Sequence, residues 1–266
     1  MFWAAGAVLL AVAVAITGWV LIMYVWTKRS ERRERAFVKN SSISNGPTFT
    51  LFLPGHGICD RSCEDFHCEY VHRSEPTIKY VHNLCSVEEC RDIIYRYRKR
   101  MKRSNVFKNG SRKDVQRTSY TAFTDGEKDL QLKAIMARIA KLINRPIEWL
   151  EKPQLTRYKK GNYYKAHYDT LVPRVDNGNY GSQREYTVVL YLNDLPEDEE
   201  GGSTSFHTVH KRVRPVCGNA LIWRNCLDNG DTDKRTLHSG DPIVRRHSTK
   251  YILTVWSRMG PCEHGS

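Results

Sequence analysis

The feature that most constrains the fold is a series of short β-forming segments in the second half of the chain. The strongest, Tyr186 to Asn193, is rich in branched and aromatic side chains, which pack well on a pleated sheet. An acidic turn follows at 197–202, and further short strands are predicted at 203–206, 219–223 and 250–257. Many short strands separated by turns are typical of a closed or double-sheet β core. We therefore predict an α+β fold that is mainly β.

Two amphipathic helices are predicted before these strands, where they would support the β core. Ser86 and Glu89 have the spacing of a capping box, and the apolar residues that follow recur at helical intervals. A second helix is predicted from about Glu127 to Ile143, and Pro146 would end it. We interpret the apolar stripes of both helices as packing surfaces.

His167, Asp169 and His238 form a candidate metal-binding set. The alternation of an extended strand would direct His167 and Asp169 to the same side. Two histidines and one carboxylate are the ligands of the facial triad that holds ferrous iron and leaves other positions open. A His-x-Asp pair alone is a weak signal, because an isolated histidine is more often a hydrogen-bonded structural residue. The strand context favours the metal, and Lys250, twelve residues after His238, is the natural counter-charge for a dicarboxylate co-substrate.

Several ordered motifs between about Lys79 and Ser257 resemble a known enzyme family. They are Val81-His82-Asn83-Leu84, Arg117-Thr118-Ser119, Arg157-Tyr158-x-x-Gly161-x-Tyr163-Tyr164-x-x-His167-x-Asp169, Gly201-Gly202-x-Thr204-x-Phe206, Ala220-Leu221-Ile222-Trp223 and Thr236-Leu237-His238-Ser239-Gly240. Together they resemble the catalytic domain of the prolyl 4-hydroxylases. These enzymes are Fe(II)- and 2-oxoglutarate-dependent dioxygenases, so the resemblance implies a double-stranded β-helix (jelly-roll) core.

The resemblance also implies a role for individual residues. His167, Asp169 and His238 would bind Fe(II), and no catalytic residue is expected beyond this metal centre. Contacts to 2-oxoglutarate are implied for Lys250, which would pair with its distal carboxylate, and for Tyr158, Thr204, Trp256 and Tyr191. Arg184 is implied near the groove that binds the peptide. The implied reaction is 4-hydroxylation of a proline-containing protein or peptide, with succinate and carbon dioxide released and with Fe(II), 2-oxoglutarate and ascorbate as cofactors.

Two positions depart from the pattern of this family. The interval from His238 to Lys250 is two residues longer, and we expect a hairpin to absorb them without displacing Lys250. Arg258 stands where a histidine is frequent, which could alter the choice of peptide. His247 is a rival metal ligand, but its place in a polar turn favours a solvated side chain.

The first 26 residues contain no charged side chain and are long enough to cross a bilayer as one helix. The segment lacks the basic leader of a cleavable signal peptide, so we predict an uncleaved signal anchor. Basic residues at 28–35 favour a cytosolic domain. Eight cysteines, glycosylation sequons at Asn40 and Asn109 and the family resemblance instead favour the lumen of the endoplasmic reticulum. We predict a single-pass membrane glycoprotein with a luminal catalytic domain.

Residues 27–75 are predicted to form a basic, cysteine-rich stem between the anchor (1–26) and the dioxygenase domain (76–266). The stem contains three cysteines and a histidine at short spacing: Cys59, Cys63, Cys68 and His72. These residues could form a small zinc site. The alternative is a disulfide-stapled loop, using Cys85 or Cys90 as further partners, and in an oxidising lumen we favour the disulfide.

The chain carries a formal net charge of +13, but the excess is spread along its length and no nucleic-acid recognition motif is present. The partners predicted are therefore a proline-containing substrate and the membrane, without nucleic acid. Two other functions compete with proline hydroxylation. One is a related oxygenase that acts on another residue, such as lysine. Oxygenases of that kind typically anchor 2-oxoglutarate with an arginine. The other is a non-catalytic membrane adaptor, in which the metal site would have decayed.

Overall fold

The computed structural model of the chain describes residues 48–55, 58–59, 65–104, 116–125, 128–171 and 183–262. The chain divides into two compact units, Met1–Thr48 and Phe49–Ser266, and every element below belongs to the second. The predicted membrane anchor at 1–26 and both sequons lie outside the described residues. A search of the described helices finds none with the length and apolar character needed to cross a membrane.

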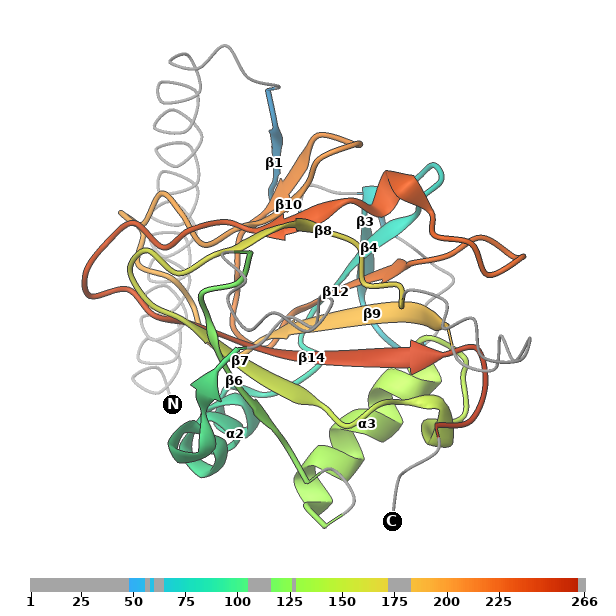
Figure 1. Cartoon of the computed structure of the whole chain (residues 1–266), viewed down its shortest axis with the longest axis horizontal. Coiled ribbons are helices and arrows are strands. Elements are labelled where there is room, and N and C mark those ends of the chain that lie inside the picture. Colours follow the sequence, from blue (N-terminus) through green and yellow to red (C-terminus); the bar gives the residue numbers. More distant parts are fainter. Residues whose placement is uncertain are drawn as a thin grey trace, which may run out of the picture. The chain divides into compact units, whose positions relative to one another are not determined.

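The described strands form two sheets, as the prediction of a mainly β fold requires (Figure 1). The smaller sheet has the order β1 (Thr50–Phe52), β11 (Lys211–Val213), β10 (Thr204–Phe206), β13 (His238–Gly240) and β8 (Tyr164–His167). The larger has the order β2 (Ile58–Cys59), β3 (Cys68–His72), β4 (Ile78–Val81), β12 (Ala220–Arg224), β9 (Arg184–Tyr191), β14 (Lys250–Arg258), β7 (Gln154–Tyr158), β6 (Tyr120–Phe123) and β5 (Lys102–Arg103). Strands β1 to β3, within the segment predicted as a stem, are thus part of the sheets.

The four strands predicted in the second half of the chain correspond to β9, β10, β12 and β14, each within two residues at either end. Strand β9 lies at the centre of the larger sheet and is buried on both faces. Its alternate residues therefore enter two different cores. Val188 and Leu190 join the core on the helix side, whereas Val189 and Tyr191 join the core between the sheets.

Both predicted helices are present and pack on the larger sheet (Figure 1). Helix α2 (Val87–Tyr97) begins with the expected capping box, in which Ser86 and Glu89 each accept the other's backbone N–H. Helix α3 (Leu130–Leu142) begins later than predicted, because the Asp129 side chain accepts the first free N–H groups. The described residues also include three short 3-10 helices: η2 (Arg98–Arg100), η3 (Ile147–Trp149) and η4 (Lys234–Thr236).

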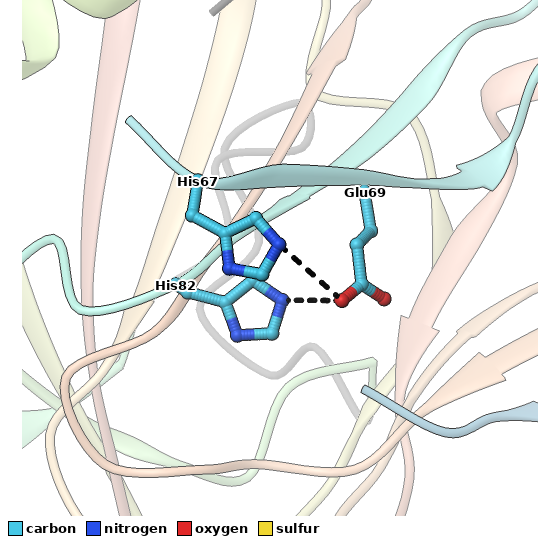
Figure 2. A group of neighbouring side chains, drawn as sticks. All are labelled: His67, Glu69 and His82. Carbon is cyan, nitrogen blue, oxygen red and sulfur yellow. Dashed lines mark hydrogen bonds and ion pairs between the residues drawn. The ribbon is translucent and has the colours of Figure 1, made fainter. Parts of the chain in front are cut away.

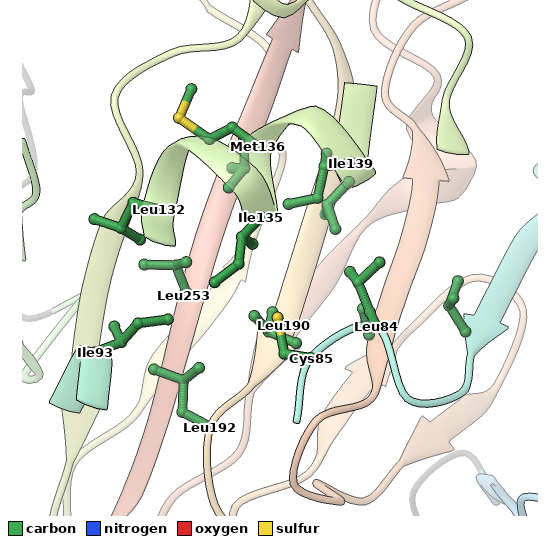
Figure 3. Close-up of a cluster of buried hydrophobic side chains, with 14 of the residues drawn as sticks. Leu84, Cys85, Ile93, Leu132, Ile135, Met136, Ile139, Leu190, Leu192 and Leu253 are labelled. Atoms are coloured by element: carbon green, nitrogen blue, oxygen red, sulfur yellow. The ribbon is translucent and has the colours of Figure 1, made fainter. Parts of the chain in front are cut away.

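Side chains of α2, α3 and the larger sheet meet in one hydrophobic core (Figure 3). Ile93 of α2 and Leu132, Ile135 and Ile139 of α3 are fully buried, and they share this core with Leu253 of β14. Burial of each such side chain stabilises the fold by about 1.5–3 kcal/mol. With one face of the sheet covered in this way, its other face is directed to the smaller sheet.

The segment between His238 and Lys250 is not the hairpin expected from the sequence. Strand β13 pairs within the smaller sheet and β14 within the larger, so the intervening chain crosses between the two. The buried Glu199 carboxylate holds this crossing, accepting the backbone N–H groups of Gly201, Val244 and Arg245. The added residues are accommodated in the turn while Lys250 stays at the start of β14. His247 is exposed, as predicted.

The cysteines of the predicted stem are partly described. Cys68 is disulfide-bonded, so its sulfur is not free to be a zinc thiolate. Cys85 and Cys90 are free thiols, so the suggestion that they pair with the stem is wrong. The ring nitrogen Nδ1 of His72 lies 2.9 Å from the carbonyl oxygen of Pro76. These contacts agree with the disulfide that we favoured from the sequence and not with the zinc site.

Candidate active site

The structure brings His167, Asp169 and His238 together between the two sheets. His167 ends β8 and pairs directly with His238, which begins β13, while Asp169 follows β8 by two residues. The Nε2 atom of His167 lies 3.4 Å from Asp169 Oδ1, and the Nε2 atom of His238 lies 3.6 Å from Asp169 Oδ2. Neighbouring ligand atoms around a small octahedral ion are about 3 Å apart. The donor set and its spacing therefore fit a divalent metal ion.

Backbone contacts orient both imidazoles toward Asp169. The Nδ1 atom of His167 lies 2.7 Å from the Lys165 carbonyl oxygen, and that of His238 lies 2.9 Å from the Thr236 carbonyl oxygen. A carbonyl can only accept, so each ring carries its proton on Nδ1 and presents the Nε2 lone pair to the site. Sequence spacing gave no sign of these two contacts.

The protonation states at this site suit metal binding. Burial lowers the pKa of His238 to about 4, so its imidazole is neutral at pH 7. Burial alone would raise the pKa of Asp169, but His238 and His167 hold it far below its ordinary value. A metal ion requires neutral imidazole and ionised carboxylate, so His238 and Asp169 need lose no proton near neutral pH.

Thr187 and Asn225 form a hydrogen-bonded chain that orients the Asp169 carboxylate, and neither residue was predicted from the sequence. The Thr187 hydroxyl donates to Asp169 Oδ2 at 2.8 Å and accepts from the Asn225 amide at 2.8 Å. All three side chains are buried. Thr187 lies two residues before Val189 in β9, so its polar side chain faces the space between the sheets. That alternation was the available signal, but it could not identify Asp169 as the partner.

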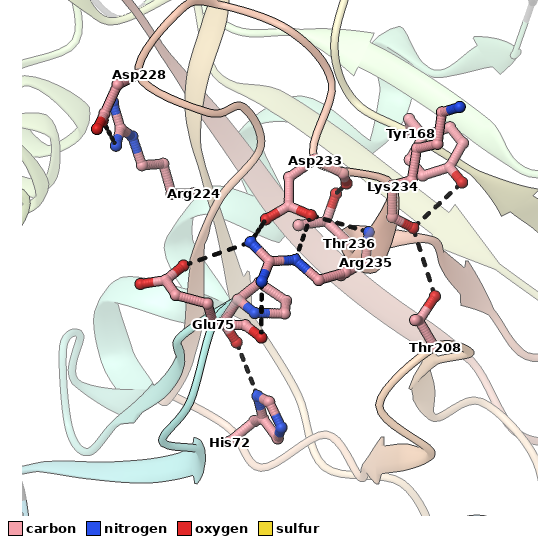
Figure 4. A network of polar contacts seen from close by, with 11 residues as sticks. His72, Glu75, Tyr168, Thr208, Arg224, Asp228, Asp233, Lys234, Arg235 and Thr236 are labelled. Atoms are coloured by element: carbon pink, nitrogen blue, oxygen red, sulfur yellow. Dashed lines mark hydrogen bonds and ion pairs between the residues drawn. The ribbon is translucent and has the colours of Figure 1, made fainter.

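A polar network fixes the segment that carries His238 (Figure 4). At the start of η4, the carboxylate of the capping residue Asp233 accepts the Arg235 backbone N–H at 2.9 Å and pairs with its guanidinium at 2.8 Å. The Thr236 hydroxyl donates to the Asp233 carbonyl at 2.7 Å. The Tyr168 hydroxyl donates to the Lys234 carbonyl at 3.2 Å and so joins this segment to the one between His167 and Asp169. This hydrogen bond connects the segment that carries His167 and Asp169 to the segment that carries His238.

Lys250 lies in the same cavity as the triad and is 2% exposed. Its Nζ atom donates to the Gly202 carbonyl at 2.7 Å, and the described residues provide it with no ion pair. Burial lowers the pKa of Lys250 to about 8. An ammonium has three donors, so a buried lysine with one backbone contact is equipped to receive an anion.

The other residues predicted to contact the co-substrate surround Lys250. Tyr158 and Thr204 line the cavity, and the Tyr191 hydroxyl donates to Thr204 Oγ1 at 2.9 Å. The Nζ atom of Lys250 lies 5.4 Å from the centre of the Tyr158 ring and 5.8 Å from that of Tyr191. Tyr191 therefore contacts the site through Thr204, since it is not itself part of the cavity lining.

Trp256 also lines the cavity and connects it to Arg184. The Trp256 indole N–H is buried and has no hydrogen-bond partner within the described residues, which leaves a donor for a bound molecule. The Arg184 guanidinium stacks 3.8 Å from the indole centre and makes two bonds to the Glu151 carboxylate, at 2.8 and 2.7 Å. Arg258 pairs with the same carboxylate. Arg117, a further lining residue, stacks on Tyr164.

Comparison with known proteins agrees with this geometry. The family model of the 2OG-Fe(II) oxygenase superfamily matches residues 153–258, which include the triad and Lys250. The probable prolyl 4-hydroxylase 3 of Arabidopsis thaliana is 31% identical over 208 residues, covering 70% of each chain. The chain belongs to the prolyl 4-hydroxylase family. Prolyl 4-hydroxylase 1 of the same plant is also 31% identical, over 202 residues and 69% of each chain.

The fold of this prolyl 4-hydroxylase family member is similar to that of a solved viral enzyme. The viral collagen prolyl hydroxylase of Paramecium bursaria Chlorella virus-1, solved as a 2OG complex, superposes with a TM-score of 0.55 at 23% identity. The match covers 68% of this chain and 94% of the viral one. The chain is an oxidoreductase of the Fe(II)- and 2-oxoglutarate-dependent dioxygenases.

Proposed function

We propose that this chain hydroxylates peptidyl proline at C4, with Fe(II), 2-oxoglutarate and dioxygen, and releases succinate and carbon dioxide. The observation that carries the proposal is the convergence of His167, Asp169 and His238 in one cavity with the buried Lys250. Membership of the prolyl 4-hydroxylase family supports proline as the substrate residue. The two packed sheets support a jelly-roll core as the scaffold.

Within this proposal, each part of the cavity has one task. His167, Asp169 and His238 hold Fe(II), which supplies the oxidising chemistry for an unactivated C–H bond when 2-oxoglutarate and dioxygen are present. Lys250 neutralises the distal carboxylate of 2-oxoglutarate, and the hydroxyl groups of Thr204 and Tyr158 donate to it. Val189, Ile252 and Trp256 complete the wall and exclude water from the bound co-substrate. Ascorbate would maintain the iron in its ferrous form.

The peptide would bind beside Trp256 and Arg184. Glu151 holds the Arg184 guanidinium over the indole of Trp256, so this arginine is fixed beside a residue that lines the cavity. Arg258, at the position where histidine is frequent in the family, is drawn to the same carboxylate. We propose that this arginine pair selects residues flanking the target proline. Their charge would favour acidic flanking side chains or backbone carbonyls.

Two further proposals concern location. The uncharged segment 1–26 would anchor the protein, and the disulfide at Cys68 supports a luminal catalytic unit in the endoplasmic reticulum. The sequons at Asn40 and Asn109 would then be glycosylated.

The competing functions fit the site less well. A lysine-directed oxygenase would use arginine to anchor 2-oxoglutarate, but Arg245 is exposed beside Asp198 and neither it nor Arg258 lines the cavity. The cation positioned to anchor 2-oxoglutarate in the cavity is Lys250. A non-catalytic adaptor would not preserve two imidazoles oriented on one buried carboxylate.

The test is a turnover assay of the full-length chain with Fe(II), ascorbate and 2-oxoglutarate. Proline-rich and collagen-like peptides are compared with peptides in which alanine replaces each proline and with lysine-containing peptides. Succinate formation and a gain of one oxygen only on proline would support the proposal. Oxygen gained on lysine would refute it in favour of the related oxygenase. His238→Ala should be inactive, whereas the exposed His247→Ala serves as a matched control and should keep activity.

A further inference from the structure

A second group of metal-ligating side chains lies on the β3–β4 pair, away from the residues of the candidate active site. His67, Glu69 and His82 place their ligand atoms within 4.8 Å of one another. None of the three belongs to the cysteine-rich set predicted from the sequence, and none lines the cavity of the triad.

The local strand register accounts for the cluster. In the antiparallel pair, Cys68 lies opposite Val81, so the residue before β3 lies opposite the residue after β4. His82 donates its backbone N–H to the His67 carbonyl at 2.9 Å, which places the two histidines side by side. Glu69 follows His67 by two residues and therefore points to the same face of the strand. The backbone thus directs all three side chains to one side.

The Glu69 carboxylate is built into the fold. It is 2% exposed, and both of its oxygens accept the backbone N–H of Gly55, at 2.9 and 3.1 Å. A fixed, buried carboxylate with a backbone donor behind it resembles the supported ligands of metal sites, whose orientation is set by such contacts.

Both imidazoles turn toward the same oxygen of this carboxylate. Their rings stack with centres 4.3 Å apart and planes 14° apart, and Figure 2 shows both Nε2 atoms directed at Glu69. The Nε2 atom of His82 lies 2.9 Å from Glu69 Oε1, but that of His67 lies 3.9 Å away, too far for a hydrogen bond. The hydrogen bond therefore accounts for the position of His82, whereas His67 stacks on the His82 ring with its Nε2 atom directed at the carboxylate but not hydrogen-bonded to it.

A bound ion would explain both histidines. With bonds of 2.0–2.2 Å, two ligand atoms of a tetrahedral zinc ion are about 3.3–3.6 Å apart, and the two observed separations of 2.9 and 3.9 Å bracket this range. Two imidazoles and a carboxylate suit zinc better than calcium or magnesium, which prefer oxygen alone. We propose that His67, Glu69 and His82 bind Zn²⁺ at a second metal site. The His67 side chain is 59% exposed, so the ion has access from solvent and keeps water as its fourth ligand.

Zinc at this site would connect three parts of the larger unit. Glu69 belongs to β3, His82 follows β4, and the carboxylate also holds the turn at Gly55. Strand β4 in turn pairs with β12 in the larger sheet. The site would thus stabilise the edge of the sheet without taking part in hydroxylation.

The experiment counts zinc ions on the metal-stripped full-length chain after equilibrium dialysis. The triad can also hold zinc, so wild type should bind two ions per chain, while His67→Ala and His238→Ala should each bind one. His67→Ala suits the test because the side chain is exposed and its loss should leave the fold intact. The matched control is His72→Ala, at the end of β3 and outside the cluster, which should bind as many ions as wild type.

A second measurement separates this site from the triad. Cobalt replacing zinc at a four-coordinate site gives an intense visible spectrum, which should be lost in His67→Ala and in Glu69→Gln but kept in His238→Ala. The rise in thermal midpoint that zinc produces should show the same dependence, since an ion that binds only the folded chain stabilises it. If His67→Ala and Glu69→Gln bind as much zinc as wild type, the second site does not exist. A wild-type chain whose entire zinc content is lost in His238→Ala would overturn the proposal equally.

Discussion

Lys250→Met tests the assignment of the 2-oxoglutarate anchor. The substitution keeps the length of the side chain and removes its charge, so the cavity is preserved while the anion loses its partner. Lys250 is 2% exposed, and the carboxylate of a bound co-substrate would be buried with it. The variant should therefore weaken binding of 2-oxoglutarate much more than it disturbs the fold, where one bond to Gly202 is lost.

The size of the effect follows from the burial of the pair. Removing one partner of a buried, hydrogen-bonded charge pair costs about 2–5 kcal/mol. A middle value of about 3 kcal/mol corresponds to a rise of roughly 140-fold in the KM for 2-oxoglutarate, at about 1.4 kcal/mol per factor of ten. The KM for peptide should change little, because the proposed peptide contacts are Arg184 and Trp256 and the Lys250 side chain is fully buried.

The pH dependence gives the same assignment an independent signature. The pKa of Lys250 is about 8 in the absence of an anion, and only the protonated form attracts a carboxylate. Roughly one lysine in ten is protonated one unit above its pKa, so the wild-type KM for 2-oxoglutarate should rise about tenfold between pH 7 and pH 9. Lys250→Met should lack this rise.

Steady-state succinate assays at saturating peptide measure both effects. Lys159→Met, which removes an exposed lysine just after β7, is the control and should leave both the KM and its pH dependence unchanged. The reasoning is refuted if Lys250→Met keeps a KM within threefold of wild type, or if it retains the rise above pH 8.

Three further predictions follow from the site and its support. His167→Ala, Asp169→Ala and His238→Ala should abolish peptide-dependent succinate formation while circular dichroism stays unchanged; full activity of His238→Ala would show that the ligand assignment is wrong. Thr187→Val should raise the Fe(II) concentration for half-maximal activity about 10–100-fold, because Asp169 loses its orienting donor. Thr187→Ser keeps the hydroxyl and should restore the wild-type iron requirement. If Thr187→Val and wild type require equal iron concentrations, Thr187 does not orient Asp169. Glu199→Gln should lower the free energy of unfolding in urea by about 1–3 kcal/mol. Burial alone would raise the pKa of Glu199, but hydrogen bonds to its carboxylate lower the pKa below its ordinary value. The stabilisation by Glu199 is therefore present above the ordinary carboxyl pKa and is lost on acidification. A difference in unfolding free energy between Glu199→Gln and wild type that persists at low pH would contradict this.

The strands and helices could be predicted because their signals are local. The branched and aromatic run in β9 and the capping box of Ser86 and Glu89 each act within a few residues. The triad could be predicted for a related reason: His167 and Asp169 share one strand, and few other chemistries use that pair with a distant histidine. His238 was identified as the third ligand from the family resemblance more than from the physical pattern of its own segment.

The residues that were missed depend on pairings that the sequence does not display. Thr187 contacts Asp169 only because β9 passes beneath the end of β8. The His67 and His82 pair exists only in the register of β3 with β4, whereas in the sequence His67 belonged to the predicted stem and His82 to a motif of the family resemblance. The crossing after His238 was mistaken for a hairpin because spacing alone does not say which sheet a strand joins.

The most direct test of the central claim is a stoichiometric turnover under labelled dioxygen. The full-length chain is supplied with Fe(II), ascorbate, 2-oxoglutarate and a proline-containing peptide, and the hydrolysed product is analysed for hydroxyproline isomers. We expect one succinate for each 4-hydroxyproline, with the new oxygen derived from dioxygen, and no product from His238→Ala. Folded wild-type protein that binds iron yet forms no hydroxyproline on any proline peptide, while oxidising another residue, would contradict it.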